Sequence, residues 1–487
     1  MAASMLQAIV DDTSLDAAVE AVKLAVDHLE LSASEAVPVT SSASAAELSA
    51  RFSGALPRAG RPLAEVLEGV ARDVAADSIL LSHPMYLGHQ VSAPLPAAIW
   101  TEPVISAINN SLAVREMSPA GTALETALIG HFTRLAGWGA EAGGTFTSGG
   151  TEATTAALMA ARASALPEAW EEGVGANPPV LVCGEHAHYA VTRAAGILGL
   201  GRRNVVVVAS SGYRMDPAAL QRALDGLASE GRRAMAVVAT AGSTPTGSFD
   251  DLEAIGHCCA EHGVWLHVDG AHGASALISA RHRHRLRGLE LARSLAWDPH
   301  KLLLMPLSAG MVLVRQERDL DAAFAQQAPY LFHNAEGVRV PDLGVRSLAC
   351  SRRFDALKLW VAIQRYGLDG LEACHDHLVG LAATLHQRLT LHGGFELPHE
   401  PESNILCFRW RGDSGASPES LNALNLALRE RYNGSGEGWI TTTVLEARRM
   451  LRVTIMNPRT TTDHLDRLVS GLASTAAALV DEVPAWR

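Results

Sequence analysis

Lys301 is the residue of this sequence with the clearest chemical potential. It ends the motif Trp297-Asp298-Pro299-His300-Lys301, between an apolar run at 294–296 and the apolar segment Leu302–Met305. Burial among apolar neighbours lowers the pKa of an amine and makes it nucleophilic near neutral pH. Taken alone, the motif is compatible with a Schiff-base lysine and also with a surface lysine whose stem is buried.

Asp269 ends a second apolar segment, Trp265–Asp269, and small residues follow it. In open α/β sheets, ligands bind beyond the carboxyl ends of the strands, so we expect Asp269 to point toward a cofactor. A capping aspartate at a strand exit is the alternative for this residue alone. Pyridoxal phosphate (PLP) requires both groups, because a lysine forms an imine with its aldehyde and a carboxylate keeps its pyridine nitrogen protonated. Together, Lys301 and Asp269 predict a PLP site.

A glycine- and hydroxyl-rich motif precedes a predicted helix. The segment Thr145–Thr154 reads Thr-Phe-Thr-Ser-Gly-Gly-Thr-Glu-Ala-Thr and leads into an alanine-rich helix at 156–164. Free backbone N–H groups at a helix start can bind phosphate, although an ordinary capped helix has the same composition. Upstream, Gly137–Ala142 matches the loose dinucleotide-binding pattern, but Trp138 and the following Gly143-Gly144 leave no clear strand–turn–helix frame. The sequence therefore disfavours a nicotinamide cofactor.

These motifs lie where short apolar runs alternate with glycine turns and helical segments. Strands are predicted at Val180–Cys183, Val205–Ala209, Ala234–Ala239, Val264–Val268 and Ala309–Val314. Such alternation indicates βαβ units and a doubly wound, mostly parallel α/β sheet. We expect an N-terminal helical segment at 1–80, a large PLP-binding domain at 81–375 and a small C-terminal α+β domain at 376–487.

The flanking parts carry their own patterns. The predicted helices are Leu15–Leu31, Pro62–Ile79, Val379–Leu391 and Pro418–Arg431, and the predicted C-terminal strands are Asn404–Trp410 and Met450–Met456. In the sequence, the N-terminal elements therefore precede the large domain and the C-terminal elements follow it.

The composition excludes several classes of protein. The 487 residues are 48% hydrophobic and 19% charged, and 40 Lys+Arg against 52 Asp+Glu give a formal charge of −12. This acidic balance argues against nucleic-acid binding and against an anionic membrane surface. Six irregularly spaced cysteines are typical of reduced thiols, and the sequence has no signal-peptide pattern, so we expect a cytoplasmic protein. No spacing of ligands predicts a metal site.

With these motifs in this order, the sequence resembles the group II PLP-dependent amino-acid decarboxylases. This family includes the glutamate, cysteine-sulfinate, diaminobutyrate and aromatic amino-acid decarboxylases. The resemblance runs from about His83 to Pro458, and Asp298-Pro299-His300-Lys301 is its most specific part. It implies the PLP-dependent transferase fold of type I, a homodimer, and decarboxylation of an L-amino acid to its amine and CO₂.

The resemblance also implies roles for single residues. Lys301 corresponds to the imine-forming lysine, Asp269 to the partner of the pyridine nitrogen, and His188 to a ring-stacking histidine. An imidazole is flat enough to stack and can also exchange protons near the substrate. The other cofactor contacts that the resemblance implies are Ser148, Gly150, Thr151, Thr244, Ala271 and His300.

Three residues are implied on the substrate side. Arg452 matches the family arginine that holds a substrate carboxylate, which a guanidinium can do bidentately; a surface strand arginine is the alternative. Gln90 and Asn110 match segments that line the substrate pocket. Gln90 and Arg452 together favour a polar or acidic substrate, with an aromatic amino acid as the alternative.

Two positions depart from the family pattern. Asp298 replaces the asparagine that commonly precedes Pro-His-Lys, which would place a carboxylate near the cofactor phosphate unless it points away. In addition, many members carry a proton-donating tyrosine in the loop before Arg353, whereas Leu331–Arg352 contains no tyrosine and Tyr330 precedes it. Tyr330, His333 or His188 could replace that acid. If none does, we expect O₂ to intercept the reaction and an aldehyde to form.

Overall fold

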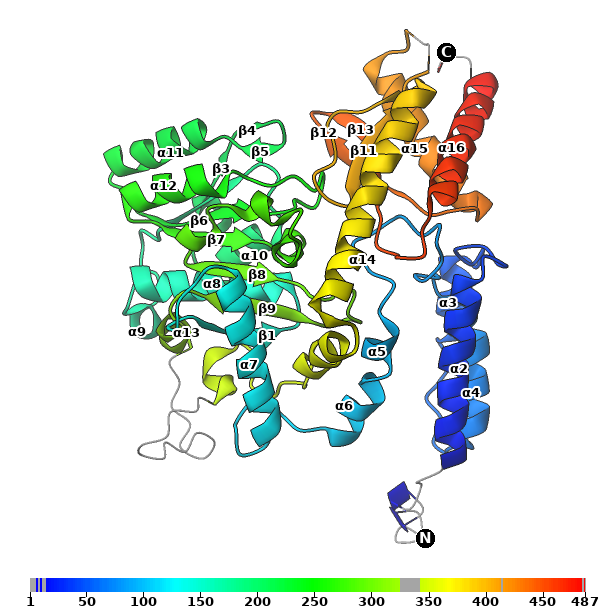
Figure 1. The fold of residues 1–487 in the computed structure, drawn as a ribbon, viewed down its shortest axis with the longest axis horizontal. Helices are drawn as coiled ribbons and strands as arrows, with labels where there is room; N and C mark the ends of the chain where they lie inside the picture. The colour runs from blue at the N-terminus through cyan, green and yellow to red at the C-terminus, as the bar shows by residue number, and fades with distance from the viewer. Residues whose placement is uncertain are drawn as a thin grey trace.

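The structure is a computed structural model that describes residues 6, 7, 9, 10, 15–324, 342–412, 415–483 and 486. N-terminal helices, a large domain built on a seven-stranded sheet and a small domain built on a four-stranded sheet follow one another along the chain (Figure 1). Within the described part of the chain, no helix is long and apolar enough to span a bilayer.

The large sheet is mostly parallel. Its strands, in spatial order, are β1 (Gly143–Thr147), β9 (Gly310–Val314), β8 (Ser294–Trp297), β7 (Trp265–Asp269), β6 (Ala234–Thr240), β2 (Val180–Gly184) and β3 (Val205–Val208). Only β9 runs antiparallel to its neighbours, β1 and β8. Strands β1, β8, β7 and β6 therefore end at the same edge of the sheet, which is where ligands collect in such folds.

Both faces of this sheet are covered by helices, because the central strands carry apolar side chains on both sides. In β2, Val180 and Val182 pack into one core while Leu181 and Cys183 pack into another. Helices α8 (Gly150–Ala165), α10 (Ala190–Ile197) and α13 (Arg318–Ala323) contribute to the second core, and α7 (Pro119–Leu135), α11 (Pro217–Ser229), α12 (Leu252–His262) and α14 (Ala356–His392) contribute to the first. Burial on both faces fits the continuous apolar runs of the sequence.

The small domain has an antiparallel sheet in the order β10 (Phe395–Glu396), β11 (Ile405–Trp410), β13 (Arg448–Thr454) and β12 (Thr441–Leu445). Helices α15 (Pro418–Ser435) and α16 (Thr462–Glu482) pack on it. Helix α14 links the two domains and carries a break at Gly367, whose φ of 70° and ψ of 170° are not helical. The break lets one helix contact both sheets.

The N-terminal helices α2 (Leu15–Ala33), α3 (Ala45–Arg51) and α4 (Leu63–Asp73) stand beside the rest of the chain (Figure 1). Their apolar side chains are poorly covered: Leu15 is 80% exposed and Leu56, between α3 and α4, is 91% exposed. The remaining short elements are α5 (Pro96–Ile99), α6 (Glu102–Ile108), α9 (Ala169–Glu172), β4 (Ser210–Ser211) and β5 (Arg214–Met215).

The predicted α/β fold is confirmed, and the five predicted strands are β2, β3, β6, β7 and β9, with ends shifted by at most one residue. The absence of a strand–turn–helix frame at Gly137–Ala142 is confirmed, because helix α7 precedes this segment and strand β1, which was not predicted, follows it from Gly143. A Cβ on Gly144 would lie 2.2 Å from the carbonyl oxygen of Val312, so glycine is needed where β1 pairs with β9. The division of the chain at 375 stays a prediction, and α14 runs through that position.

Candidate active site

A cavity of about 300 Å³ opens at the strand edge where β1, β6, β7 and β8 end. All nine residues that the sequence assigned to the cofactor line it: Ser148, Gly150, Thr151, His188, Thr244, Asp269, Ala271, His300 and Lys301. They come from five separate loops, so only the folded sheet brings them together. The cavity is therefore the candidate active site.

Lys301 follows β8 by a short turn, and its backbone N–H donates to the Asp298 carbonyl at 2.9 Å. Its side chain is 18% exposed, with Nζ 3.3 Å from Oδ2 of Asp298. The same Asp298 oxygen lies 3.4 Å from Nε2 of His300. The Asp298 side chain therefore points into the cavity, beside Lys301 and His300, and not away from it.

Asp269 ends β7, and its side chain is 7% exposed. Its Oδ1 accepts a hydrogen bond from the backbone N–H of Ala271 at 3.2 Å. Asp269 therefore caps the strand exit and also lines the cavity. The carboxylate is held in place by this loop, with its remaining acceptor sites facing the cavity that it lines.

His188 lies between β2 and α10 and lines the same cavity. Its Nδ1 accepts from the backbone N–H of Ala190 at 3.3 Å, which places the proton of the neutral ring on Nε2. Burial lowers the pKa of His188, while the carboxylate of Asp269 acts in the opposite direction. The ring is therefore neutral at physiological pH, and Nε2–H is its free donor.

The first turn of α8 forms another wall of the cavity. Ser148 donates from its backbone N–H at 2.8 Å and from its hydroxyl at 2.6 Å, both to Oε2 of Glu152. Gly150 begins the helix, and a Cβ there would lie 2.7 Å from that of Ala271 and 3.0 Å from Oδ2 of Asp298. Glycine is thus required at position 150, where the helix start approaches Ala271 and Asp298. Without a side chain at this position, the helix N-terminus stays open to an anion.

Two further histidines in the wall are kept neutral. Burial lowers the pKa of His300, whose Nδ1 accepts from the backbone N–H of Ala309 at 3.1 Å. Burial and then the charge of Lys301 lower the pKa of His272 to about 3, and its Nε2 bonds to Oδ1 of Asn404 at 2.7 Å. This second bond connects the cofactor side of the cavity to the start of β11.

The three substrate-side residues lie outside the wall of this cavity. Arg452, on β13, is 6% exposed. Among the described residues, the only hydrogen bond of its side chain is a long one of 3.5 Å from Nη1 to the Thr441 hydroxyl. Its charge contributes to the low pKa of His272, so it lies within electrostatic reach of the cavity. Gln90 is half-buried, and its amide nitrogen finds no partner in the described chain. Asn110 is exposed and lines a separate cavity of about 460 Å³ with Ser351.

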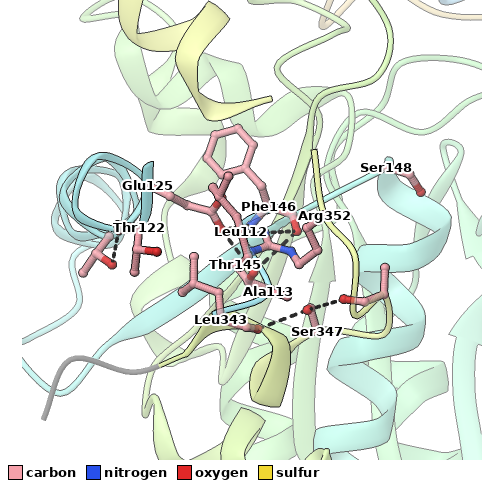
Figure 2. Close-up of polar contacts among 12 residues, drawn as sticks. Leu112, Ala113, Thr122, Glu125, Thr145, Phe146, Ser148, Leu343, Ser347 and Arg352 are labelled. Atoms are coloured by element: carbon pink, nitrogen blue, oxygen red, sulfur yellow. Dashed lines mark hydrogen bonds and ion pairs between the residues drawn. The ribbon is translucent and has the colours of Figure 1, made fainter. Parts of the chain in front are cut away.

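A buried ion pair supports strand β1 just before the turn at Ser148. Figure 2 shows Glu125 of α7 and Arg352 pointing toward each other beside Phe146. The Arg352 Nη2 donates to Oε1 of Glu125 at 2.6 Å and to the carbonyl of Phe146 at 2.9 Å, and the same Glu125 oxygen accepts from the Phe146 N–H at 2.9 Å. The pair anchors β1, which leads directly into Ser148.

Sequence reasoning missed several lining residues. Glu152 lies inside the motif Thr145–Thr154, and His272 follows Asp269 by three residues. Their positions next to predicted site residues could have indicated both. The others are Gly149, Thr240, Gly242 and Leu307, and for Leu307 the sequence offered no signal. The candidate proton donors Tyr330 and His333, and the first half of the loop without tyrosine, lie outside the described residues.

The cavity residues fit PLP. A strand-end lysine and a strand-end carboxylate face one cavity with a flat, neutral imidazole, and an open helix N-terminus offers unpaired N–H groups to a phosphate. A mostly parallel sheet with this constellation at its carboxyl edge defines a PLP-dependent enzyme of fold type I. Within the described residues, no cluster of three or more metal-ligating side chains is present.

Comparison with known proteins identifies the family. The model of the pyridoxal-dependent decarboxylase conserved domain matches residues 51–411, and the chain belongs to this family of PLP-dependent amino-acid decarboxylases. The chain is 35% identical to the L-2,4-diaminobutyrate decarboxylase of Rhizobium meliloti (strain 1021), over 87% of this chain and 84% of that protein. It is 34% identical to the cysteine sulfinic acid decarboxylase of Rattus norvegicus, over 75% and 76%. The crystal structure of mouse CSAD superposes with a TM-score of 0.90 at 30% identity, over 96% of this chain and 99% of that one.

Proposed function

We propose that Lys301 is the residue that binds PLP covalently in a decarboxylase acting on a polar or acidic L-amino acid. The observation that carries this proposal is that the chain has only three lysines, at 23, 301 and 358. Lys23 is exposed on α2, and Lys358 is fully buried, with Nζ bonded to Glu102 at 2.8 Å and Asp355 at 3.0 Å. Of the three, Lys301 alone lines the cavity.

The other cavity residues hold and orient the reacting groups. When bound, PLP supplies the electron sink for the bond that breaks as CO₂ leaves. Asp269 holds a proton at the pyridine nitrogen, and His188 stacks on the ring while its Nε2–H stays free to donate. Ala271 would lie against the ring, and Thr244 would contribute a hydroxyl on the cofactor side. The phosphate contacts are Ser148, Gly150, Thr151 and His300.

Arg452 is proposed to hold the substrate α-carboxylate. The guanidinium has two nitrogen atoms, Nε and Nη2, without a partner in the described chain, and such buried donors are rarely left unused. These two N–H groups lie side by side and match a carboxylate bidentately. Gln90 and Asn110 are the proposed contacts of the substrate side chain, and the substrates named for the two relatives support a polar one.

The homodimer and the cytoplasmic location are also proposals. The exposed apolar side chains of α2 and α4 form a face that a second copy of this chain would cover, and Asn110 stands on the surface beside a cavity of its own. All six cysteines are free, including the exposed Cys350, which is typical of a reducing compartment.

The test is to reduce the PLP-loaded protein with borohydride and to identify the labelled lysine by peptide mass spectrometry. Label on Lys301 is expected, and label on Lys23 or Lys358 contradicts the proposal. Lys301→Ala should lose the visible absorbance of bound cofactor, while the matched control Lys23→Ala should keep it. The loaded protein is then given diaminobutyrate, cysteine sulfinate, glutamate and aromatic amino acids while O₂ is followed. We expect amine without O₂ uptake; aldehyde with O₂ uptake would establish the oxidative alternative.

A further inference from the structure

Asp298 places a carboxylate at the phosphate end of the cavity. Its side chain is almost fully buried, at 1% exposure, and lines the cavity with Lys301 and His300. Oδ2 lies 3.3 Å from Nζ of Lys301 and close enough to Gly150 that a Cβ there would be 3.0 Å away. The oxygen thus stands at the start of α8, where the helix N-terminus attracts negative charge. The other oxygen, Oδ1, has no hydrogen-bond partner among the described residues.

The positive charge in the cavity is too small to balance both the Asp298 carboxylate and an entering anion. Three carboxylates line the wall, from Glu152, Asp269 and Asp298, against the single ammonium of Lys301. Burial lowers the pKa of His300 and of His188, so neither ring supplies a second positive charge near neutral pH. Glu152 is engaged by both hydrogen bonds from Ser148, whereas Asp298 keeps one oxygen unpaired.

We propose that Asp298 is an affinity-setting residue that competes with the cofactor phosphate for the start of α8 and for the positive charge of Lys301. In the cofactor-free chain, the carboxylate itself is the anion beside the helix N-terminus. A phosphate that enters must displace it or bring a proton to it, because two anions in one low-dielectric site repel each other. This inference rests on the proposed function, since it takes the helix start as the phosphate site.

The competition concerns only ligands that carry the phosphate. The groups facing Asp298 are Lys301 and His300 on its own loop, Glu152 on α8, and His188 and Asp269 across the cavity. Replacement of Asp298 by asparagine removes the competing charge and leaves these other groups in place.

The experiment measures ligand binding to the cofactor-free full-length chain, without turnover. Pyridoxamine phosphate is used because it lacks the aldehyde and cannot react with Lys301, and pyridoxamine is the matched ligand without the phosphate. Dissociation constants for both are measured by calorimetry at pH 8. The variants are Asp298→Asn and, as a control for net charge, Asp466→Asn, an exposed carboxylate on α16 paired with Arg388.

Asp298→Asn is expected to bind pyridoxamine phosphate at least about tenfold more tightly than the natural chain at pH 8, which is the scale of one removed charge repulsion. Pyridoxamine affinity should stay unchanged. Unchanged or weaker binding of pyridoxamine phosphate overturns the inference, as does an equal gain for both ligands, which would place the effect at the ring or at Lys301. If Asp298→Asn does not fold, Asp298→Ser is measured in its place, and the same two outcomes overturn the inference. Borohydride labelling away from Lys301 would instead overturn the proposed function.

Discussion

Removing Arg352 should destabilise the large domain far more than removing an exposed arginine. Its guanidinium is 6% exposed, and the carboxylate of Glu125 that it neutralises is fully buried, at 0%. Figure 2 shows Glu125 near Thr145 and Phe146 of β1, and its Oε1 also accepts from the Thr145 hydroxyl and the Phe146 N–H. Among the described residues, Arg352 is its ion-pair partner. Arg352→Met therefore strands a buried negative charge, and breaking such a pair costs about 3–5 kcal/mol.

A double-mutant cycle separates this charge effect from lost packing. Glu125→Gln keeps an oxygen that can accept from the N–H of Phe146, and Arg352 keeps its carbonyl partners, so its cost should be nearer to about 1–3 kcal/mol. In the combined variant no charge remains buried, so its cost should fall below the sum of the two single variants by at least about 2 kcal/mol.

The assay is urea unfolding of the cofactor-free chain, followed by far-UV circular dichroism and by tryptophan fluorescence. Coincident transitions from the two probes are required before free energies are compared. The control variant is Arg388→Met, which removes an exposed pair with Asp466 and should leave the midpoint almost unchanged. Additive single and double variants, or an Arg352→Met chain as stable as the control, would refute the reasoning.

Three further predictions concern binding, acidity and assembly. Arg452→Lys should raise KM for the amino acid with little change in PLP affinity, because an ammonium cannot hold a carboxylate bidentately; a KM equal to that of the natural enzyme would contradict its role. Burial lowers the pKa of His267 to about 4 and that of His272 to about 3. Both folded pKa values lie below the unfolded histidine pKa of about 6.5. The two neutral histidines therefore contribute fully to stability above pH 6.5, and this contribution is lost as pH falls. The urea midpoint should decrease on acidification, and it should decrease less steeply in His267→Gln. Leu15→Glu combined with Val19→Glu should dissociate the proposed homodimer, and a sedimentation profile unchanged by these charges would exclude α2 from the interface.

Strand positions were predictable because the strands of a doubly covered sheet are continuous apolar runs. The five strands predicted for the large domain needed no long-range information, and three of them, β2, β6 and β7, end at the cavity near His188, Thr244 and Asp269. Strand β1 was missed because its glycines weaken strand propensity. Glycine is needed at position 144 because the carbonyl of Val312 lies close to it, and Val312 is far away in the sequence.

Contacts that depend on several distant segments were beyond sequence reasoning. The direction of the Asp298 side chain depends on Lys301, His300 and the start of α8 together, and no spacing pattern encodes that choice. Leu307 lines the cavity through a loop without a recognisable motif. Asn110 was grouped with the substrate residues, whereas in the single chain it lines a different cavity, and its predicted role depends on the proposed second copy.

The order of the strands also determines when this site can exist during synthesis. Strand β1 has a single hydrogen-bonded neighbour in the sheet, and that neighbour is β9. On the ribosome, Gly143–Thr147 thus emerges with no partner until Gly310–Val314 has been made, and an unpaired strand edge is a risk for aggregation. Insertion of β9 places the turn at Ser148 beside the loop of Lys301 in a single late step. A nascent chain interrupted before this step should fail to retain PLP, so cofactor capture would report that the central sheet is complete.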